Sequence, residues 1–309
     1  MKRRSLLSVA LSSWLVALSK SPATATPVFL DYDQEEFNKA YDQSFWARQM
    51  AQLEADDGIA SAAIRKTTPP VTKQYGPTNA DLIDVFAPAG GRAAPMLVFL
   101  HGGAWTRNTS DDASYPAPTF MERGAAYLAS DFGSLETVRL PQMVESCRAA
   151  VAWTVRNAKS FGGDPNRVFL AGHSSGAHLA ACVLTTDWTA HSLPKDAIKG
   201  GFLLSGMYDL YPVLLSSRSS FLQLSPEEIV ELSPVRHLDR ITCPIAIVSA
   251  DEDSPEFKRQ SNVFAEVLKG MGRLASRTVA FKANHFQEPE RLTDPNTEVS
   301  KAAFSLMGI

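Results

Sequence analysis

The sequence has 309 residues, which is enough for one large domain or two small ones. Hydrophobic residues make up 45% and charged residues 20%, an ordinary balance for a chain that buries a full core. Four of the 30 basic residues and none of the 33 acidic residues lie in the first 25 positions, so the net charge of −3 becomes −7 without them. An acidic balance without runs of like charge argues against nucleic acid and anionic membranes as partners.

The first 25 residues have the three parts of an export signal. Lys2-Arg3-Arg4 is a charged start, residues 6–18 are moderately apolar, and Ala23-Thr24-Ala25 has the small-x-small form of a cleavage site. The run from Arg3 to Leu7 resembles the twin-arginine motif, with general secretion as the alternative route. The apolar run is shorter than the ~20 residues that span a bilayer, which argues against a stable membrane anchor. We therefore predict export, with the mature protein in the bacterial periplasm.

Three cysteines, Cys147, Cys182 and Cys243, are too few for a disulfide scaffold. Each lies in an apolar segment, and we expect small buried side chains there, with any disulfide between two of them left open. No C-x-x-C pair or cluster of histidine and cysteine suggests a metal site, so no metal or organic cofactor is expected.

Residues 26–309 are predicted to form a single domain, because no repeat or linker divides them. A helix with one apolar stripe is expected over residues 33–57, and Pro69-Pro70 ends that region. Strands are then predicted at residues 82–87, 96–100, 125–132, 167–171, 201–204, 244–249 and 277–281. Helices are predicted from Pro141 to the turn at 162–165, and at residues 177–185, 256–268 and 297–306.

This alternation predicts an α/β fold with a mostly parallel sheet and helices on both faces. Residues 208–239, and with them the N-terminal helix, are expected to form a small cap over the sheet. Ligands of such sheets bind at the carboxyl ends of the strands. Candidate site residues should therefore follow directly after strands.

The segment Gly172-His173-Ser174-Ser175-Gly176 matches G-x-S-x-G between a predicted strand and a predicted helix. This is the setting of the nucleophile elbow of α/β-hydrolases, where a serine stands at a sharp, strained turn. The motif predicts Ser174 as the nucleophile. Ser175 is a rival by adjacency, but it lacks the flanking glycines and is expected to donate its backbone N–H to an oxyanion. His173 is expected to pack beside the elbow.

The segment His101-Gly102-Gly103-Ala104-Trp105 directly follows the predicted strand 96–100. An H-G-G-x loop after a strand supplies oxyanion-binding N–H groups in lipases and esterases. We predict an oxyanion hole formed by Gly102 and Gly103 together with Ser175. Trp105 is expected to pack under this loop or to line the substrate pocket, and His101 to fix the loop by hydrogen bonds.

The acid and the base of a triad on this fold follow the serine in the order acid, then histidine. His285 is the only histidine beyond residue 250, and it follows the predicted strand 277–281. Four carboxylates are candidates for the acid. Position favours the three that follow the strand 244–249 over one that comes earlier, without choosing among them: Asp251, Glu252 and Asp253 against Asp209.

The chain resembles the kynurenine formamidase (arylformamidase) family in five motifs. They are H-G-G-x-W at 101–105, G-H-S-x-G-A-H-L at 172–179, S-G-x-[YF]-D-L at 205–210, D-S-P-E-F-x-R-Q-S at 253–261 and H-F at 285–286. The resemblance implies that the acid is Asp253 and that the reaction is hydrolysis of an N-formyl aryl amide, with activity on small aryl esters. Trp105, Tyr208 and Phe286 are expected to line the pocket for this small-molecule substrate.

Four alternatives accompany this interpretation. Because tryptophan breakdown is cytoplasmic and export is predicted here, an exported esterase or amidase with an unrelated small substrate is the first. A peptidase lacks room for the accessory domain that related oligopeptidases carry, and a lipase lacks an apolar lid, since residues 208–239 are rich in charge. A non-catalytic binding protein is disfavoured because all three triad residues are present.

Overall fold

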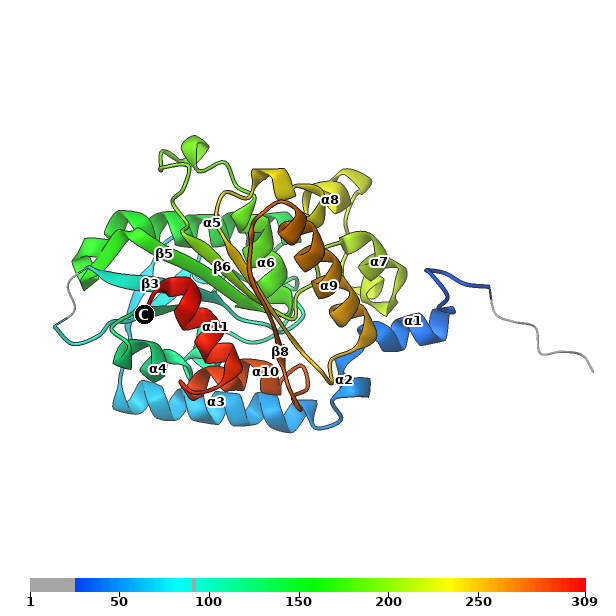
Figure 1. The fold of residues 1–309 in the computed structure, drawn as a ribbon, viewed down its shortest axis with the longest axis horizontal. Helices are drawn as coiled ribbons and strands as arrows, with labels where there is room; N and C mark the ends of the chain where they lie inside the picture. The colour runs from blue at the N-terminus through cyan, green and yellow to red at the C-terminus, as the bar shows by residue number, and fades with distance from the viewer. Residues whose placement is uncertain (1–25, 91–92) are drawn as a thin grey trace, which may run out of the picture.

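The computed structural model describes residues 26–90 and 93–309 (Figure 1). The export signal predicted over residues 1–25 lies outside the described residues. One sheet of eight strands crosses the molecule in the order β1-β2-β4-β3-β5-β6-β7-β8. The strands are β1 Val71–Gln74, β2 Leu82–Phe86, β3 Ala94–Leu100, β4 Ala126–Ser130, β5 Gly163–His173, β6 Gly200–Leu204, β7 Ile245–Ala250 and β8 Leu274–Ala280.

The sheet is parallel from β4 to β8, and only β1 and β2 join it antiparallel. The predicted mostly parallel sheet is thus confirmed. Strand β3 is buried along its whole length, as its unbroken apolar sequence indicates. Strand β1 was not predicted. All four of its residues are exposed at the sheet edge, so it has no apolar alternation for a pattern to detect.

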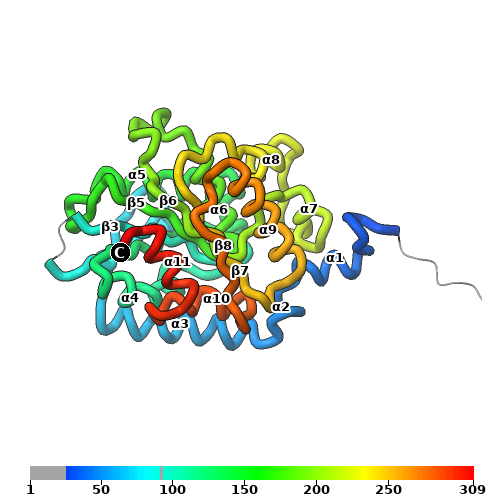
Figure 2. Tube along the Cα trace, in the orientation of Figure 1, coloured from blue at the N-terminus to red at the C-terminus, as the bar shows by residue number. Residues whose placement is uncertain are grey.

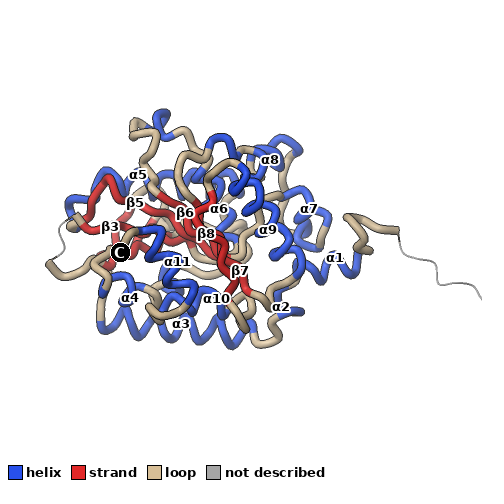
Figure 3. The backbone as a smooth tube through the Cα atoms, in the orientation of Figure 1, coloured by secondary structure: helices blue, strands red, loops and turns tan. Residues whose placement is uncertain are grey.

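Helices cover both faces of the sheet (Figure 3). Successive side chains of β3 point to opposite faces, with Val98 in one core and Phe99 in the other. The first core includes Met143, Leu179 and Phe264, and the second includes Phe304. The helices that supply these cores are α5 Leu140–Asn157, α6 Ser175–Leu184 and α9 Pro255–Gly270 on one face, and α4 Ala117–Glu122 and α11 Glu298–Met307 on the other.

The N-terminal segment consists of three helices, α1 Gln34–Tyr41, α2 Gln43–Trp46 and α3 Met50–Thr67. The prediction of one helix over residues 33–57 was wrong, because Asp42 ends α1 and its carboxylate caps α2 by accepting from Ser44 N at 3.0 Å. The turn also breaks the expected apolar stripe, and Trp46 is 40% exposed.

Residues 208–239 form short helices, among them α7 Leu210–Leu215, η4 Ser217–Ser220 and α8 Pro226–Glu231. Helix α1 packs on both η4 and α9, and Figure 2 traces the N-terminal chain beside these segments. The backbone N–H of Ser217 donates to Asn38 Oδ1 at 2.8 Å. The N-terminal segment and the residue 208–239 insertion therefore pack against each other, beside α9. Within residues 26–90 and 93–309, no helix has the length and apolar character needed to cross a membrane.

Candidate active site

Ser174 stands between the end of β5 and the start of α6, with φ 54° and ψ −120°. A side chain at this positive φ is strained, and it persists only where the surroundings enforce it. Here the backbone N–H of Ser174 donates to Leu204 O of β6 at 2.9 Å, and the glycines on either side allow close packing. A Cβ atom on Gly172 would clash with the carbonyl of Gly176, and one on Gly176 with the carbonyl of Leu100.

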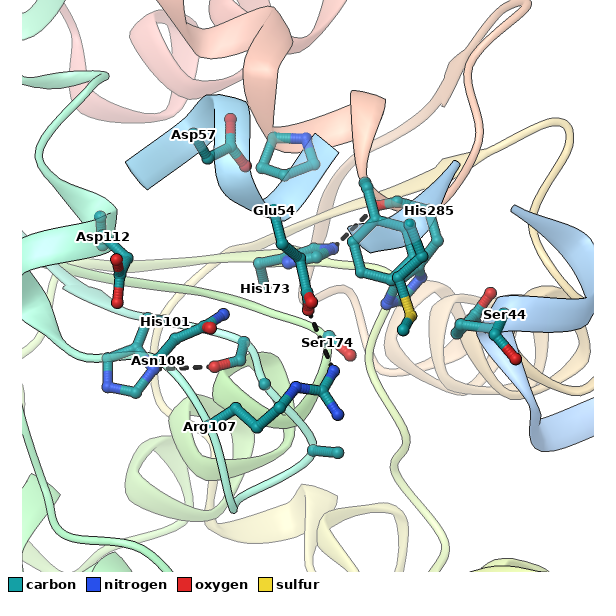
Figure 4. Close-up of a pocket in the computed structure, with 18 of the residues that line it drawn as sticks. Ser44, Glu54, Asp57, His101, Arg107, Asn108, Asp112, His173, Ser174 and His285 are labelled. Atoms are coloured by element: carbon teal, nitrogen blue, oxygen red, sulfur yellow. Dashed lines mark hydrogen bonds and ion pairs between the residues drawn. The ribbon is translucent and has the colours of Figure 1, made fainter. Parts of the chain in front are cut away.

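Asp253 and His285 form a buried pair. His285 Nδ1 lies 3.1 Å from Asp253 Oδ2, and both side chains are at most 2% exposed. Asp253 follows β7 and lies two residues before the start of α9, while His285 lies in the loop between β8 and α10 Gln287–Glu290. His285 and Ser174 line the same cavity (Figure 4).

Of the other three candidate acids, Glu252 is exposed and the two aspartates are held elsewhere. Asp209 caps α7 and pairs with Arg236 at 3.2 Å. Asp251 Oδ1 accepts from Ala283 N at 3.2 Å. Of the four candidates, Asp253 is the one whose carboxylate has a hydrogen bond to the His285 ring among the described residues.

The Asp253 carboxylate is ionised despite its burial. Burial by itself raises its pKa, but attraction to His285 and the hydrogen bonds with His285 and Gln43 together hold the pKa below its ordinary value. Its Oδ1 atom accepts from Gln43 Nε2 at 2.8 Å and from Ser254 N at 2.7 Å. A fixed negative charge therefore faces Nδ1 of the imidazole and can stabilise a protonated His285.

Two further histidines support the site as neutral rings. Burial, followed by the charge of His285, lowers the pKa of His173 to about 3, and burial lowers the pKa of His101 to about 4. His173 Nε2 lies 2.9 Å from the carbonyl of His285, so this neutral ring donates there and holds the His285 backbone. His101 Nδ1 lies 2.8 Å from the carbonyl of Gly102 and the ring stacks on Phe132, which holds the glycine loop.

The glycine loop lies against the serine. A Cβ atom on Gly102 would be 3.3 Å from Ser174 Cβ and 2.9 Å from His173 Nδ1. Gly103 has φ 114°, and its carbonyl accepts from the backbone N–H of Arg107 at 2.9 Å. This tight turn brings the backbone of both predicted oxyanion-hole glycines to the carboxyl ends of the central strands, where Ser174 stands. Ser175 begins α6 on the other side of Ser174.

The cavity has a volume of about 250 Å³. Of the three predicted pocket residues, Phe286 is in its wall, and Trp105 and Tyr208 are not. Trp105 is 2% exposed and lies edge-on to His178 with ring centroids 5.3 Å apart. The Tyr208 ring is stacked on that of Phe264, with ring centroids 4.1 Å apart. Neither side chain lines the cavity as expected, and for Trp105 the packed position is the other predicted alternative. An aromatic side chain next to a motif can point into the core as well as into a cavity.

Several polar residues that no motif marks complete the wall. They come from the N-terminal helices, the loop after β3 and the residue 208–239 insertion, and they are Gln43, Glu54, Asp57, Arg107 and Arg218. Glu54 and Arg107 form an ion pair at 3.0 Å across the cavity wall (Figure 4). Burial, and then the charge of Glu290, raise the pKa of Asp57 to about 8. No sequence signal near these positions could have identified them.

Glu288 is a fully buried carboxyl group near the acid. Neither of its carboxyl oxygens has a hydrogen-bond partner within the described residues. Burial, followed by repulsion from Asp253, raises the pKa of Glu288 well above its ordinary value, so the group is neutral.

All three cysteines are buried and free, as small apolar side chains would be. The sheet order, the serine at the strand-to-helix turn and the buried acid–histidine pair are the features of an α/β-hydrolase. The BD-FAE family model matches residues 83–199, from β2 to the residue before β6.

The kynurenine formamidase of Danio rerio is 31% identical over 292 residues, which cover 89% of this chain and 97% of that protein. The kynurenine formamidase of Salmo salar is 28% identical and covers 90% of this chain and 98% of its own. The chain therefore belongs to the kynurenine formamidase family, as its motifs predict. An esterase of Pyrobaculum calidifontis shares the fold with a TM-score of 0.67 at 17% identity, over 86% of this chain and 97% of that one.

Proposed function

We propose that the protein is a serine hydrolase that cleaves small ester or N-formyl aryl amide bonds through an acyl-enzyme intermediate on Ser174. The observation that carries this proposal is the Asp253–His285 hydrogen bond, whose imidazole shares one cavity with the strained Ser174. Family membership supports the substrate class, because two full-length relatives are kynurenine formamidases.

The chemistry follows from which ring nitrogen is engaged. Asp253 holds Nδ1 of His285, so Nε2 is the nitrogen that takes the proton of Ser174 as its oxygen attacks the carbonyl carbon. The backbone N–H groups of Gly102, Gly103 and Ser175 bind the negative oxygen of the tetrahedral intermediate. The protonated His285 then gives its proton to the departing amine or alcohol, and water releases the acid, which is formate for a formamide.

The cavity supports a small aromatic substrate. At about 250 Å³ it lies just below the range of ordinary ligand pockets, which limits it to a small ligand. Its wall includes the rings of Tyr115, Phe221 and Phe286, which offer apolar contact to an aryl group.

The test compares N-formylkynurenine with p-nitrophenyl acetate on the wild type and on Ser174→Ala. We expect the wild type to hydrolyse both and Ser174→Ala to lose about 10⁶ in kcat on each, since the nucleophile starts the reaction. A fluorophosphonate probe should label the wild type at Ser174. Near-wild-type turnover by Ser174→Ala contradicts the proposal, and activity on esters alone identifies the exported esterase alternative. The absence of both turnover and labelling identifies a binding protein.

A further inference from the structure

We propose that Gln43 is a positioning residue for the acid, so that the N-terminal arm, defined here as residues 34–46, is an integral part of the hydrolytic site. Gln43 Nε2 donates to Asp253 Oδ1 at 2.8 Å across 210 positions of sequence. Both side chains are buried, at 6% and 1% exposed. This inference rests on the proposed function, in which Asp253 orients His285.

The direction of this hydrogen bond follows from the chemistry of its partner. An ionised carboxylate only accepts, so the NH₂ group of Gln43 must face Asp253. The other amide atom, Oε1, is buried and has no partner within the described residues. Burial of an amide with one unpaired atom is unfavourable. The charge-assisted bond to Asp253 is therefore the interaction that accounts for a glutamine at this position.

The arm is fixed to the element that follows the acid. Tyr41 OH donates to Glu256 at 3.1 Å and accepts from Gln260 Nε2 at 2.7 Å. The Tyr41 ring meets that of Phe257 at 6.1 Å, with its edge toward the other ring. All three partners lie on α9, which begins two residues after Asp253. Docking of Tyr41 on α9 therefore sets where Gln43 meets the acid.

The insertion holds the same arm from its other side. Arg218 of η4 donates to the carbonyl of Tyr41, with Nη2 at 2.8 Å and Nε at 3.2 Å. The guanidinium is buried. Tyr41 is thus held between α9 and η4, immediately before the turn at Asp42 that directs Gln43 inward.

The two carboxylate oxygens of Asp253 have different partners, and this difference indicates the role of Gln43. Oδ1 is bound by Gln43 and by Ser254 N, and Oδ2 faces His285 Nδ1. Two donors on Oδ1 fix the carboxylate plane and withdraw part of the negative charge from the side that faces the imidazole. Loss of the Gln43 donor should leave more charge at Oδ2, which raises the affinity of His285 for a proton.

The experiment uses two variants of the full chain that differ in size. Gln43→Met and Gln43→Ala both remove the donor, but only Ala also removes the volume. We expect both to lower kcat for p-nitrophenyl acetate about tenfold through a misplaced acid. We also expect the acid limb of the pH profile of kcat/KM to move to higher pH by the same amount in both. Gln52→Met, an exposed glutamine of α3 that contacts Asp56, is the control and should behave like the wild type.

A packing role alone predicts a different result. In that case Gln43→Met matches the wild type, Gln43→Ala has a lower melting temperature, and neither moves the acid limb. An unmoved acid limb in Gln43→Met overturns the inference whether or not Gln43→Ala folds. Fluorophosphonate labelling of the same variants separates the two proposals. If the variants are labelled at Ser174 and the acid limb of their pH profile does not move, only the role of Gln43 is overturned. If the wild type is not labelled, the proposed function is overturned.

Discussion

The elbow and the cavity wall are built in different ways. The elbow is a continuous run of five residues, Gly172 to Gly176, at one strand-to-helix junction, and its geometry depends on backbone packing within that junction and against β3 and β6. The wall collects polar side chains from the N-terminal helices and the 208–239 insertion, which come together only when α1 docks on α9. The geometry of the elbow is therefore local, and the shape and charge of the cavity depend on long-range docking.

The largest expected effect concerns the acid, which binds the histidine that shares the cavity with the elbow serine. Asp253→Asn should lower kcat for both substrates about 10⁴-fold, because an amide stabilises neither the required tautomer nor the protonated form of His285. Steady-state kinetics measure the loss. Asp209→Asn, which changes a carboxylate that caps α7, is the matched control and should lose little. Equal losses in the two variants would contradict the assignment of the acid.

The glycine loop gives the next effect. Gly102→Ala should lower kcat by about 10²–10³, because a Cβ atom 2.9 Å from His173 Nδ1 forces the loop away from Ser174 and displaces oxyanion donors. The melting temperature should fall less than for a core variant. Gly270→Ala is the control, since its Cβ would meet nothing within 4 Å. Unchanged turnover in Gly102→Ala would remove Gly102 from the oxyanion hole.

Glu288 provides a test of stability rather than of rate. In the folded protein its carboxyl stays protonated, whereas in the unfolded chain it loses its proton above its ordinary pKa of 4.5. The unfolded state is thus favoured increasingly as pH rises, and the free energy of unfolding falls. Glu288→Gln cannot ionise, so it should match the wild type in stability at pH 4 and exceed it at pH 8, with a difference that grows by up to about 1.4 kcal/mol per pH unit above 4.5. Urea unfolding at the two pH values measures this, and an equal difference at both would show that ionisation is not the cause.

The smallest effect should come from the wall. Arg107→Met breaks the ion pair with Glu54. The Arg107 side chain in this pair is 48% exposed. An exposed pair of this kind contributes about 0–1 kcal/mol, so the melting temperature should hardly change. We expect KM to change less than tenfold and kcat to stay within twofold, because the pair touches the cavity and not the acid–histidine pair. A collapse of kcat would place Arg107 in the reacting geometry and erase the contrast between elbow and wall.

Much of the fold and of the proposed triad could be predicted from the sequence, because the signals lie in short segments or in the order of residues along the chain. The alternation of strands and helices predicts the parallel sheet, since each element carries its own apolar pattern. Ser174 is marked by glycines that only a tight turn needs, and His285 by its place in the chain order. The exposed strand β1 and the break at Asp42 carry no such pattern, and both were missed.

The tertiary structure alone decided which partners meet. Asp253, Asp251 and Asp209 are chemically alike and their positions in the chain do not identify the acid, whereas in the structure Asp253 bonds to the His285 ring and the other two have other partners. Trp105 and Tyr208 turned into the core, and Gln43 reached the acid from 210 positions away. The physical reason is that a strained turn is specified by its own backbone, whereas a hydrogen bond between distant side chains depends on how whole helices pack. The elbow could therefore be predicted from the sequence, and the surroundings of the acid could not.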